Sequence, residues 1–478
     1  MKKDSFYITT TIPYVNADPH IGFALELVQG DAIARYQRLY GREVFFSTGT
    51  DEYGQKIWEA SIKEGKNVQD YVDHYAQKFI DLKGTLDLSY DNFIRTTSKE
   101  HVRATQEFWR LCDVAGDIYK KIYRGLYCVG CEKFLTEKDL MEGVCSLHPN
   151  KTPEMVEEEN YFFKLTKYKE QLLQYLSNKK VIIPEWRRQE AIDFVKDGME
   201  DFSISRNKER FSWGIPIPGD DKQVMYVWFG AFINYISTLG WPDSKGKFEK
   251  FWQEGKRIQV AGKDMVKFQS VMWQGMLMSA GMPATDVVVY HGFITGEGGV
   301  KMSKSLGNVV SPNEIVKEYS TDALRYFLLR EISSFEDSPF TMERFKDAYN
   351  SGLANGLGNL VSRILTLSEK YLEKCPEILE HSMPQEFKDH LDKFEIQKAV
   401  NFTWNEIGAL DRFIQETEPF KVVKTDKEKG KKIITDMVLR LYTIARMLNP
   451  IMPETNILLK ALIKANKKPD KPLFPRKD

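Results

Sequence analysis

Residues 6–48 read FYITTTIPYVNADPHIGFALELVQGDAIARYQRLYGREVFFST, and this stretch decides the fold. Phe6 to Ile12 is a short, β-rich apolar run that Pro13 closes. From His20 to about Tyr40, apolar residues recur at helical spacing until a glycine ends the pattern. Glu43 to Thr48 is again typical of a buried strand. Strand, loop, helix and strand in this order predict a βαβ unit, and hence an α/β fold with a doubly wound, Rossmann-like parallel sheet.

The rest of the chain extends this plan. Residues 224–228, 257–261 and 286–290 have strand character, and we expect them in the second half of the sheet. From Thr321 onward the pattern is almost wholly helical, with bundle helices expected at residues 350–371, 385–415, 428–448 and 454–465. The predicted domains are residues 1–118 and 221–296 for the two halves of the sheet domain, 119–220 for a turn-rich inserted module, 297–349 for a loop region, and 350–478 for an α-helical domain.

Charge and composition narrow the function classes. The 478 residues include 68 basic and 68 acidic side chains, which cancel. A protein that coats nucleic acid without sequence preference usually has a basic excess, so any RNA contact here should be local and shaped. No apolar stretch approaches the length of a membrane span, and the N-terminus lacks a signal-peptide pattern. Five cysteines, an odd number, argue against a disulfide framework, so we expect a cytoplasmic protein without a membrane partner.

Pro19-His20-Ile21-Gly22-Phe23 lies where the first strand passes into the helix. We expect Asp18 as the N-cap and Pro19 as the first helical residue. Free N–H groups and the helix dipole at such a point favour a phosphate anion, which His20 could also bind as a donor. Gly22 would let the ligand approach the backbone. By itself the signal is weak, because a histidine at a helix start is more often a cap or a surface residue.

A second segment, residues 298–308, reads GGVKMSKSLGN. Its two lysines and two serines are flanked by glycines that permit loop motion. Such a loop can close over a triphosphate and bring ammonium groups to the charge that develops on the phosphates. The charge pattern alone would equally suit a solvated surface loop.

Together, these two segments resemble the signatures of class I aminoacyl-tRNA synthetases. His20-Ile21-Gly22 is similar to the first three residues of HIGH, and residues 301–305 spell KMSKS. Phe23 stands where HIGH has its second histidine. The resemblance implies catalytic roles for His20, Lys301 and Lys304, ATP binding with Mg²⁺, and a stem-contact role for residues 297–349. The implied ATP-binding residues are His20, Gly22, Lys301, Ser303 and Lys304.

Within this class the chain resembles methionyl-tRNA synthetases over nearly its whole length. The resemblance implies a methionine site and a supporting arginine, Arg206. The implied methionine-binding residues are Ile12, Tyr14, Asp51, Trp228, Ala231, Tyr235, Met265, Phe268, Gln269 and Trp273. Aromatic and aliphatic walls suit a polarizable thioether, although without the resemblance these aromatics would more often be core residues. Gly230 stands where the family usually has Asp, and Gln269 where it usually has His. The insert is too small for the editing domain of the valine, isoleucine and leucine enzymes.

A Cys/His cluster predicts one structural zinc (Zn²⁺) per chain. Cys128-x-x-Cys131 is followed, after thirteen residues, by Cys145-x-x-His148. Two close pairs of soft or borderline ligands suit tetrahedral zinc, and four protein ligands leave no open position for catalysis. The alternatives are free cysteines or a disulfide.

The first bundle helix carries Asn359 and Arg363, four residues apart and therefore on one face. An amide and a guanidinium can read the edges of unstacked bases, although a polar helix face is the default for such a pair. The resemblance implies anticodon binding by Asn359 and Arg363, and places the family's stacking tryptophan at Phe420.

The predicted function is that of a methionine–tRNA ligase, whose partners are ATP, L-methionine and tRNA(Met). Since no further module follows the bundle, we expect a monomer. The alternatives are another class I synthetase, a nucleotidyltransferase with a similar phosphate signature, and a synthetase-like RNA-binding paralogue. The departures at Phe23, Gly230 and Gln269 motivate the paralogue, whereas the intact KMSKS loop argues against it.

Overall fold

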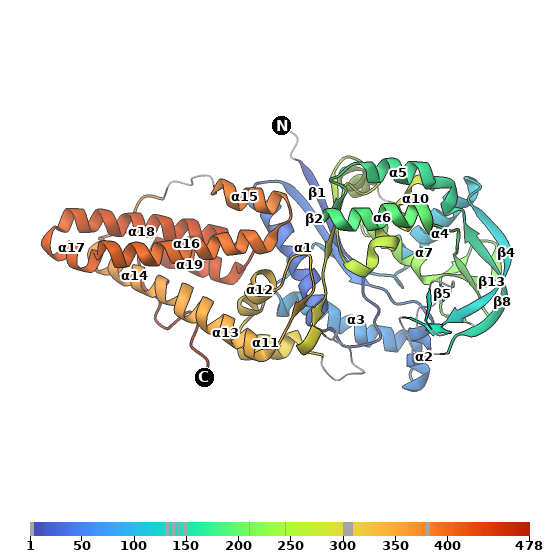
Figure 1. The fold of residues 1–478 in the computed structure, drawn as a ribbon, viewed down its shortest axis with the longest axis horizontal. Coiled ribbons are helices and arrows are strands. Elements are labelled where there is room, and N and C mark those ends of the chain that lie inside the picture. The colour runs from blue at the N-terminus through green and yellow to red at the C-terminus, as the bar shows by residue number, and fades with distance from the viewer. Residues whose placement is uncertain are drawn as a thin grey trace. The chain divides into compact units, whose positions relative to one another are not determined.

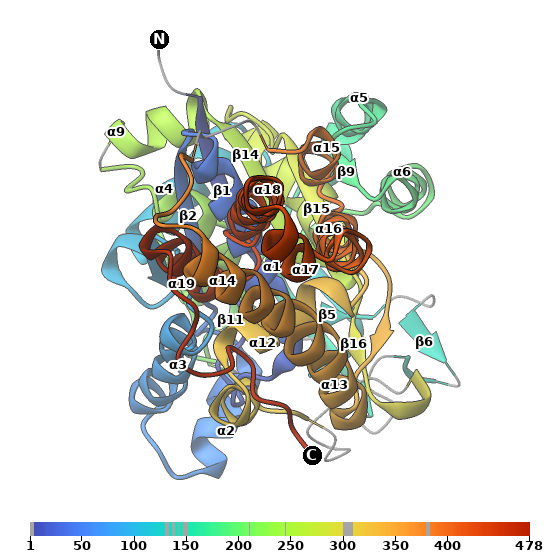
Figure 2. The same cartoon turned by 90° about the vertical axis from the view of Figure 1, so that its left-hand side faces the viewer.

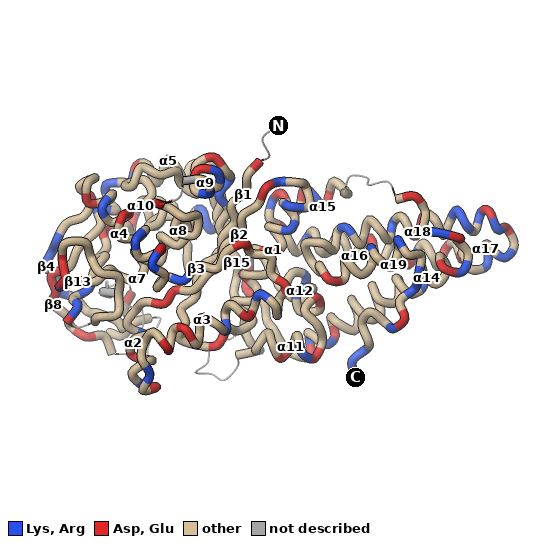
Figure 3. Tube along the Cα trace, turned by 180° about the vertical axis from the view of Figure 1, so that it is seen from behind, with Lys and Arg blue, Asp and Glu red and all other residues tan. Residues whose placement is uncertain are grey.

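The computed structural model describes residues 4–129, 133–135, 139–141, 143–146, 152–209, 211–243, 245–299, 309–378 and 383–478. The chain divides into two compact units, and each is interleaved in sequence. Unit 1 comprises Met1–Pro19, Glu43–Lys83 and Tyr90–Tyr290, and unit 2 comprises His20–Arg42, Gly84–Ser89 and His291–Asp478. Lys/Arg and Asp/Glu residues are interspersed in both units, in keeping with their equal totals (Figure 3).

Unit 1 is built on a six-stranded sheet in the order β3-β2-β1-β14-β15-β9, of which β1 and β2 are labelled in Figure 1. The strands are β1 (Ser5–Thr10), β2 (Glu43–Thr50), β3 (Asn92–Arg95), β9 (Ile182–Ile183), β14 (Lys256–Gly262) and β15 (Val287–His291). β1 pairs in parallel with β2 and with β14, so that Ile8 lies opposite Phe46 and Ile258. All three of these side chains are buried, as the continuous apolar runs predicted. The expected doubly wound parallel sheet is therefore confirmed, together with its strands at residues 257–261 and 286–290.

Residues 224–228 do not join this sheet, and their assignment to it was wrong. β13 (Asp220–Met225) pairs antiparallel with β11 (Ser205–Asn207) and with β12 (Pro216–Ile217) in a separate three-stranded sheet. The chain then turns at once into the helix α7 (Val227–Phe232). A short apolar run fits a buried helix as well as a buried strand, so periodicity could not separate the two.

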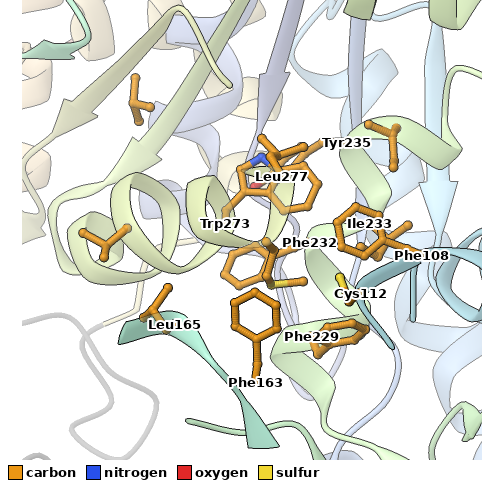
Figure 4. Packing of buried hydrophobic residues seen from close by; sticks show 14 of the residues in the cluster. Phe108, Cys112, Phe163, Leu165, Phe229, Phe232, Ile233, Tyr235, Trp273 and Leu277 are labelled. Carbon is orange, nitrogen blue, oxygen red and sulfur yellow. The ribbon is translucent and has the colours of Figure 1, made fainter. Parts of the chain in front are cut away.

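The inserted segment forms a long antiparallel ladder of β4 (Ile118–Cys128) and β8 (Glu154–Phe163), which lie side by side in Figure 1. Two helices follow, α5 (Lys169–Ser177) and α6 (Glu185–Asp197). Helices α4 (Lys99–Val114), α8 (Asn234–Ser237) and α10 (Trp273–Ser279) share one large aromatic core with α7. Figure 4 shows Trp273 at the centre of that core, and its ring centroid lies 5.9 Å from those of Phe108 and Phe232.

Unit 2 contains α1 (Ile21–Leu39) and the expected helical bundle, which Figure 2 views nearly end-on. The bundle helices include α14 (Asn359–Tyr371), α15 (Gln385–Asp392), α16 (Ile396–Thr417), α17 (Pro419–Thr425), α18 (Lys427–Met447) and α19 (Pro453–Ala465). Residues 385–415 are two helices, not one, because the chain turns at Phe394, whose φ of 61° is left-handed. The first predicted bundle helix begins as a π-helical segment, Tyr349–Gly358, before α14.

A buried ion pair ties three parts of unit 2 together. Arg325, on α12 (Thr321–Arg330), pairs with Asp31 of α1 at 2.8 Å, and neither side chain is exposed. The same guanidinium donates to the carbonyl oxygens of Leu86, Pro450 and Ile451. Among the described residues no helix is both long and apolar enough to cross a membrane.

Candidate active site

Three half-buried aromatic residues form one wall of the predicted methionine site in unit 1. The rings of Trp228 (on α7) and Phe268 are stacked, with centroids 4.2 Å apart and planes at 17°. Tyr14 meets Trp228 edge-on at 6.5 Å. The loop after β1 and two helical segments therefore supply a continuous aromatic surface, of the kind that a thioether side chain contacts favourably.

A buried polar pair lies behind this wall. The Tyr235 hydroxyl of α8 donates to Gln269 Oε1 at 3.1 Å, and Gln269 is not exposed. The amide nitrogen of Gln269 is buried and has no hydrogen-bond partner among the described atoms. Such a donor can orient a weak acceptor, so glutamine can supply the polar contact expected at this position.

Asp51 directly follows β2 and is only 5% exposed. The Asp51 backbone N–H donates to the Pro13 carbonyl at 2.9 Å, and the Val15 N–H donates to the Asp51 carbonyl at 3.3 Å. This parallel bridge fixes Tyr14 opposite Asp51. A carboxylate is thus held beside the aromatic wall, where it could pair with an ammonium group.

The other predicted methionine residues are placed less directly. Ala231 lies one turn after Trp228 on α7, and Trp273 is fully buried in the core with its ring 5.8 Å from that of Tyr235. Met265 packs against the same core. Ile12 is half-buried in the loop between β1 and the Asp51 bridge.

Arg206 is held rigidly on β11. Its guanidinium carbon lies 4.2 Å from the ring centroid of Tyr226 and 5.4 Å from that of Tyr127. Nη1 donates to Ser203 Oγ and to the Ser205 carbonyl. Cation–π contacts on two sides and these hydrogen bonds fix a buried positive charge next to the start of α7.

The helix start in unit 2 differs from the sequence-based expectation. His20, not Asp18, is the N-cap of α1, and its Nδ1 accepts the Gly22 N–H at 3.0 Å. Pro19 precedes the helix, and Asp18 instead pairs with Lys78 at 2.7 Å. Because Nδ1 accepts, the proton of the neutral ring is on Nε2.

The expectation that free backbone N–H groups at this helix start bind phosphate was wrong. The Ile21 N–H donates to the Val310 carbonyl at 3.0 Å, the Gly22 N–H to His20 Nδ1, and the Phe23 N–H to the His20 carbonyl. These three donors are already used, so they are not free for phosphate. A Cβ on Gly22 would lie 2.7 Å from His20 Cε1, which explains why glycine follows the histidine at this spacing.

The KMSKS segment, with Lys301, Ser303 and Lys304, lies outside the described residues. Residues on either side of 300–308 are described. Gly298 and Gly299 adopt left-handed φ values of 71° and 78°. Val310, five residues after Ser305, accepts the hydrogen bond from the Ile21 N–H, so this part of the chain lies next to His20.

Two of the four predicted zinc ligands are described. Cys128 ends β4, Cys145 ends β7 (Val144–Cys145), and both pack in one small buried cluster with Leu135. Cys131 and His148 lie outside the described residues. No cluster of three metal-ligating side chains occurs among the residues that are described.

The predicted anticodon-reading residues lie in the bundle. Asn359 is exposed at the start of α14. Arg363, one turn later, forms an ion pair with Asp411 of α16. Phe420 is 40% exposed near the start of α17. In the described part of the bundle, no ring contact or hydrogen bond joins Phe420 to Asn359 or Arg363.

His101 is a buried polar contact of α7 and α8 that the sequence analysis missed. It is fully buried on α4, and its Nδ1 lies 2.9 Å from Ser237 Oγ of α8. It also hydrogen-bonds the backbone of Gly230, on α7. A lone histidine on a helix gave no signal for this role, because only the tertiary fold brings these helices together.

The parallel sheet, the His20 signature at the start of α1 and the KMSKS sequence are those of a class I aminoacyl-tRNA synthetase. The family model described as "tRNA synthetases class I (M)" matches residues 6–150 and 136–365. The methionine–tRNA ligase of Caldanaerobacter subterraneus subsp. tengcongensis is 40% identical over 470 residues, covering 95% of this chain and 73% of that protein. That of Rhizobium meliloti is 40% identical over 469 residues, covering 94% and 90%. The chain belongs to the methionine–tRNA ligase family.

A solved structure gives the same assignment. Mycobacterium tuberculosis methionyl-tRNA synthetase in complex with methionyl-adenylate matches with a TM-score of 0.91 and 32% identity, over 99% of this chain and 100% of that one. Similarity to ligases along almost the whole chain disfavours an RNA-binding paralogue and a nucleotidyltransferase.

Proposed function

We propose that this chain activates L-methionine with ATP and transfers it to tRNA(Met). A methionine carboxylate oxygen attacks the α-phosphorus of ATP, and pyrophosphate leaves. A hydroxyl of the terminal adenosine then attacks the methionyl carbonyl, and AMP leaves. The observation that carries the proposal is the backbone bridge that holds Asp51 opposite Tyr14.

Each part of the methionine molecule has a matching group in unit 1. The Asp51 carboxylate would pair with the ammonium group, and the wall of Tyr14, Trp228 and Phe268 would contact the thioether chain. The Gln269 amide nitrogen would donate toward the sulfur. Ile12, Ala231, Tyr235, Met265 and Trp273 complete the proposed site, and Arg206 supports it through Tyr226.

The phosphate chemistry falls to His20, Gly22, Lys301, Ser303 and Lys304. His20 Nε2 carries the proton that could be donated to a phosphate oxygen, since Nδ1 is engaged by Gly22. The two lysines would stabilise the charge on the α-phosphate and pyrophosphate. Mg²⁺ bound with ATP would neutralise phosphate charge. Residues 297–349 would contact the tRNA stem.

The remaining proposals concern folding and RNA recognition. One zinc, held by Cys128, Cys131, Cys145 and His148, would stabilise the inserted module, and the shared burial of Cys128 and Cys145 fits this. Asn359, Arg363 and Phe420 would contact anticodon bases, and the exposure of Asn359 and Phe420 supports this. We also propose a monomeric protein and, from its cysteine usage, a cytoplasmic one.

Lys304→Ala tests the phosphate role. Methionine-dependent ATP–pyrophosphate exchange should fall strongly, while methionine binding measured by calorimetry is retained. An unchanged exchange rate would refute the role of Lys304. For the metal, elemental analysis should find about one zinc per chain. A protein without zinc would overturn the metal assignment.

A further inference from the structure

Two aromatic pairs outside the methionine site join two segments of unit 1. Tyr53 pairs with Trp213 at a centroid distance of 5.2 Å, and Trp58 pairs with Phe211 at 6.2 Å. Tyr53 and Trp58 belong to the segment that continues from Asp51 into α2 (Gln55–Lys63). Phe211 and Trp213 lie in the loop between β11 and β12. We call these four residues the aromatic shelf, of which only Phe211 is buried and the other three are half-buried.

The shelf is held in place by polar contacts. The Trp213 indole N–H donates to the Glu52 carbonyl at 2.7 Å. The Glu52 carboxylate is unexposed and accepts two hydrogen bonds from Arg95, of 2.6 and 2.9 Å. A Cβ on Gly214 would lie 2.8 Å from Val224 Cβ, so the loop that carries Trp213 packs tightly on β13. A half-exposed indole is therefore held in a fixed orientation before any ligand binds, which lowers the cost of binding.

The shelf begins beside the group that would bind methionine. Tyr53 is two residues from Asp51, and burial, followed by the charges of Glu52 and Asp51, raises the pKa of Tyr53 to about 12. Its hydroxyl therefore stays neutral and lies within the field of both carboxylates. Lys56 Nζ, on α2, lies 5.9 Å from the ring centroid of Tyr14, which meets Trp228 of the methionine wall. Aromatic faces and a cation thus adjoin Asp51.

This combination fits one part of the proposed reaction that nothing described so far binds. The carbonyl carbon that the RNA hydroxyl attacks is bonded directly to the carbon that carries the ammonium group. The ribose of the terminal nucleotide must therefore come within reacting distance of a group held by Asp51, and its base must lie within a nucleotide's length. Unpaired bases are held by stacking on aromatic side chains, and their phosphates by cations.

We propose that the aromatic shelf, with Lys56 at its edge, binds the unpaired 3′-terminal nucleotides of the tRNA and orients the terminal ribose for acyl transfer. This inference rests on the proposed function, because it places the second substrate relative to Asp51. It assigns the shelf no part in forming the adenylate.

The test measures adenylate formation and transfer to tRNA separately, in the parent and in three variants. Trp213→Leu removes the ring, and Trp213→Phe keeps an aromatic face but loses the hydrogen bond to Glu52. Trp186→Leu, at a tryptophan that is 51% exposed on α6, is the matched control. Adenylate formation is followed by methionine-dependent ATP–pyrophosphate exchange. Transfer is followed in single turnovers, by mixing isolated enzyme–methionyl-adenylate with a tRNA(Met) transcript.

Because Trp213→Leu removes the stacking of one base, its transfer rate should be about 5- to 150-fold lower than that of the parent. Exchange should stay within about twofold of the parent, and Trp213→Phe should transfer within about threefold of it. The Trp186 control should match the parent in both assays.

Three results would overturn the inference. One is normal transfer by Trp213→Leu. Another is an equal loss of exchange and transfer, which would make Trp213 part of the methionine site. The third is equal damage by the Phe and Leu variants, which would assign the effect to the Glu52 hydrogen bond. Absence of exchange and charging in the parent protein would instead refute the proposed function, so the two failures are distinguishable.

Discussion

His101 should make the stability of unit 1 fall in mild acid. Its ring is fully buried on α4 and lies between Ser237 of α8 and Thr105, at 2.9 and 3.3 Å. Burial lowers the pKa of His101 to about 3, and the hydrogen bond with Gly230 opposes this only in part. The folded protein therefore keeps this imidazole neutral at pH values where the unfolded chain binds a proton.

The size of the effect follows from the two pKa values. An unfolded histidine titrates near pH 6.5, so above that pH His101 has no proton-linked cost. As the pH falls from about 6.5 toward 3, the unfolded state alone takes up the proton, and stability falls by about 1.4 kcal/mol per pH unit. At pH 5 the loss that His101 causes should be about 2 kcal/mol.

The variant His101→Gln isolates this contribution. Glutamine can hydrogen-bond to Ser237 and to Gly230, but it does not titrate. The free energy of unfolding is measured in urea at pH 7.5 and pH 5.0, and His74→Gln, an exposed histidine on α3 (Val68–Thr85), is the control. Between the two pH values the parent should lose about 2 kcal/mol more than His101→Gln. Equal losses in the two proteins would refute the buried, neutral state of His101.

Three further substitutions test the site and the fold. Asp51→Asn removes the proposed partner of the ammonium group. In pyrophosphate exchange, the KM for methionine should rise about 10- to 150-fold, while the KM for ATP stays within about twofold of the parent. An unchanged KM for methionine would contradict the assignment. Gly22→Ala places a Cβ 2.7 Å from His20 Cε1, so kcat for exchange should fall about tenfold or more, whereas methionine affinity by calorimetry should not change. Arg325→Leu removes the fully buried partner of Asp31, which keeps only the partly exposed Arg35 as a charged partner, and also removes the donor to three backbone carbonyls. It should lower the free energy of unfolding by about 3–5 kcal/mol. Arg35→Leu, which removes a partly exposed partner of the same carboxylate, should cost clearly less, and equal costs would count against the buried pair.

The sequence predicted the elements with strong, long periodicity and missed those that depend on tertiary contacts. β1, α1 and β2 lie within one or two residues of their predicted limits, because a proline, a glycine and a 19-residue helical pattern mark them. Residues 224–228 were misplaced because a five-residue apolar run carries no reliable period. The break at Phe394 was missed because no proline or glycine marks it.

For the candidate site too, the sequence identified some residues and missed those that depend on tertiary contacts. Signature residues could be named from the sequence, and a cap was one alternative for His20, but Asp18 was expected as the N-cap because histidine is not a favoured one. Free amides at the start of α1 were expected from helix geometry, yet Val310, nearly three hundred residues away in the chain, uses one of them. His101 and Trp213 were missed because their partners, Ser237 and Glu52, are distant in sequence.

The most direct test of the central claim is ATP–pyrophosphate exchange with each of the twenty amino acids, followed by charging of tRNA(Met) with the amino acid that supports exchange. A wall of Tyr14, Trp228 and Phe268 beside Asp51 predicts strong exchange with methionine, little with the other nineteen, and stable methionyl-tRNA as the product. Exchange with a different amino acid, or no exchange with methionine, would contradict the account.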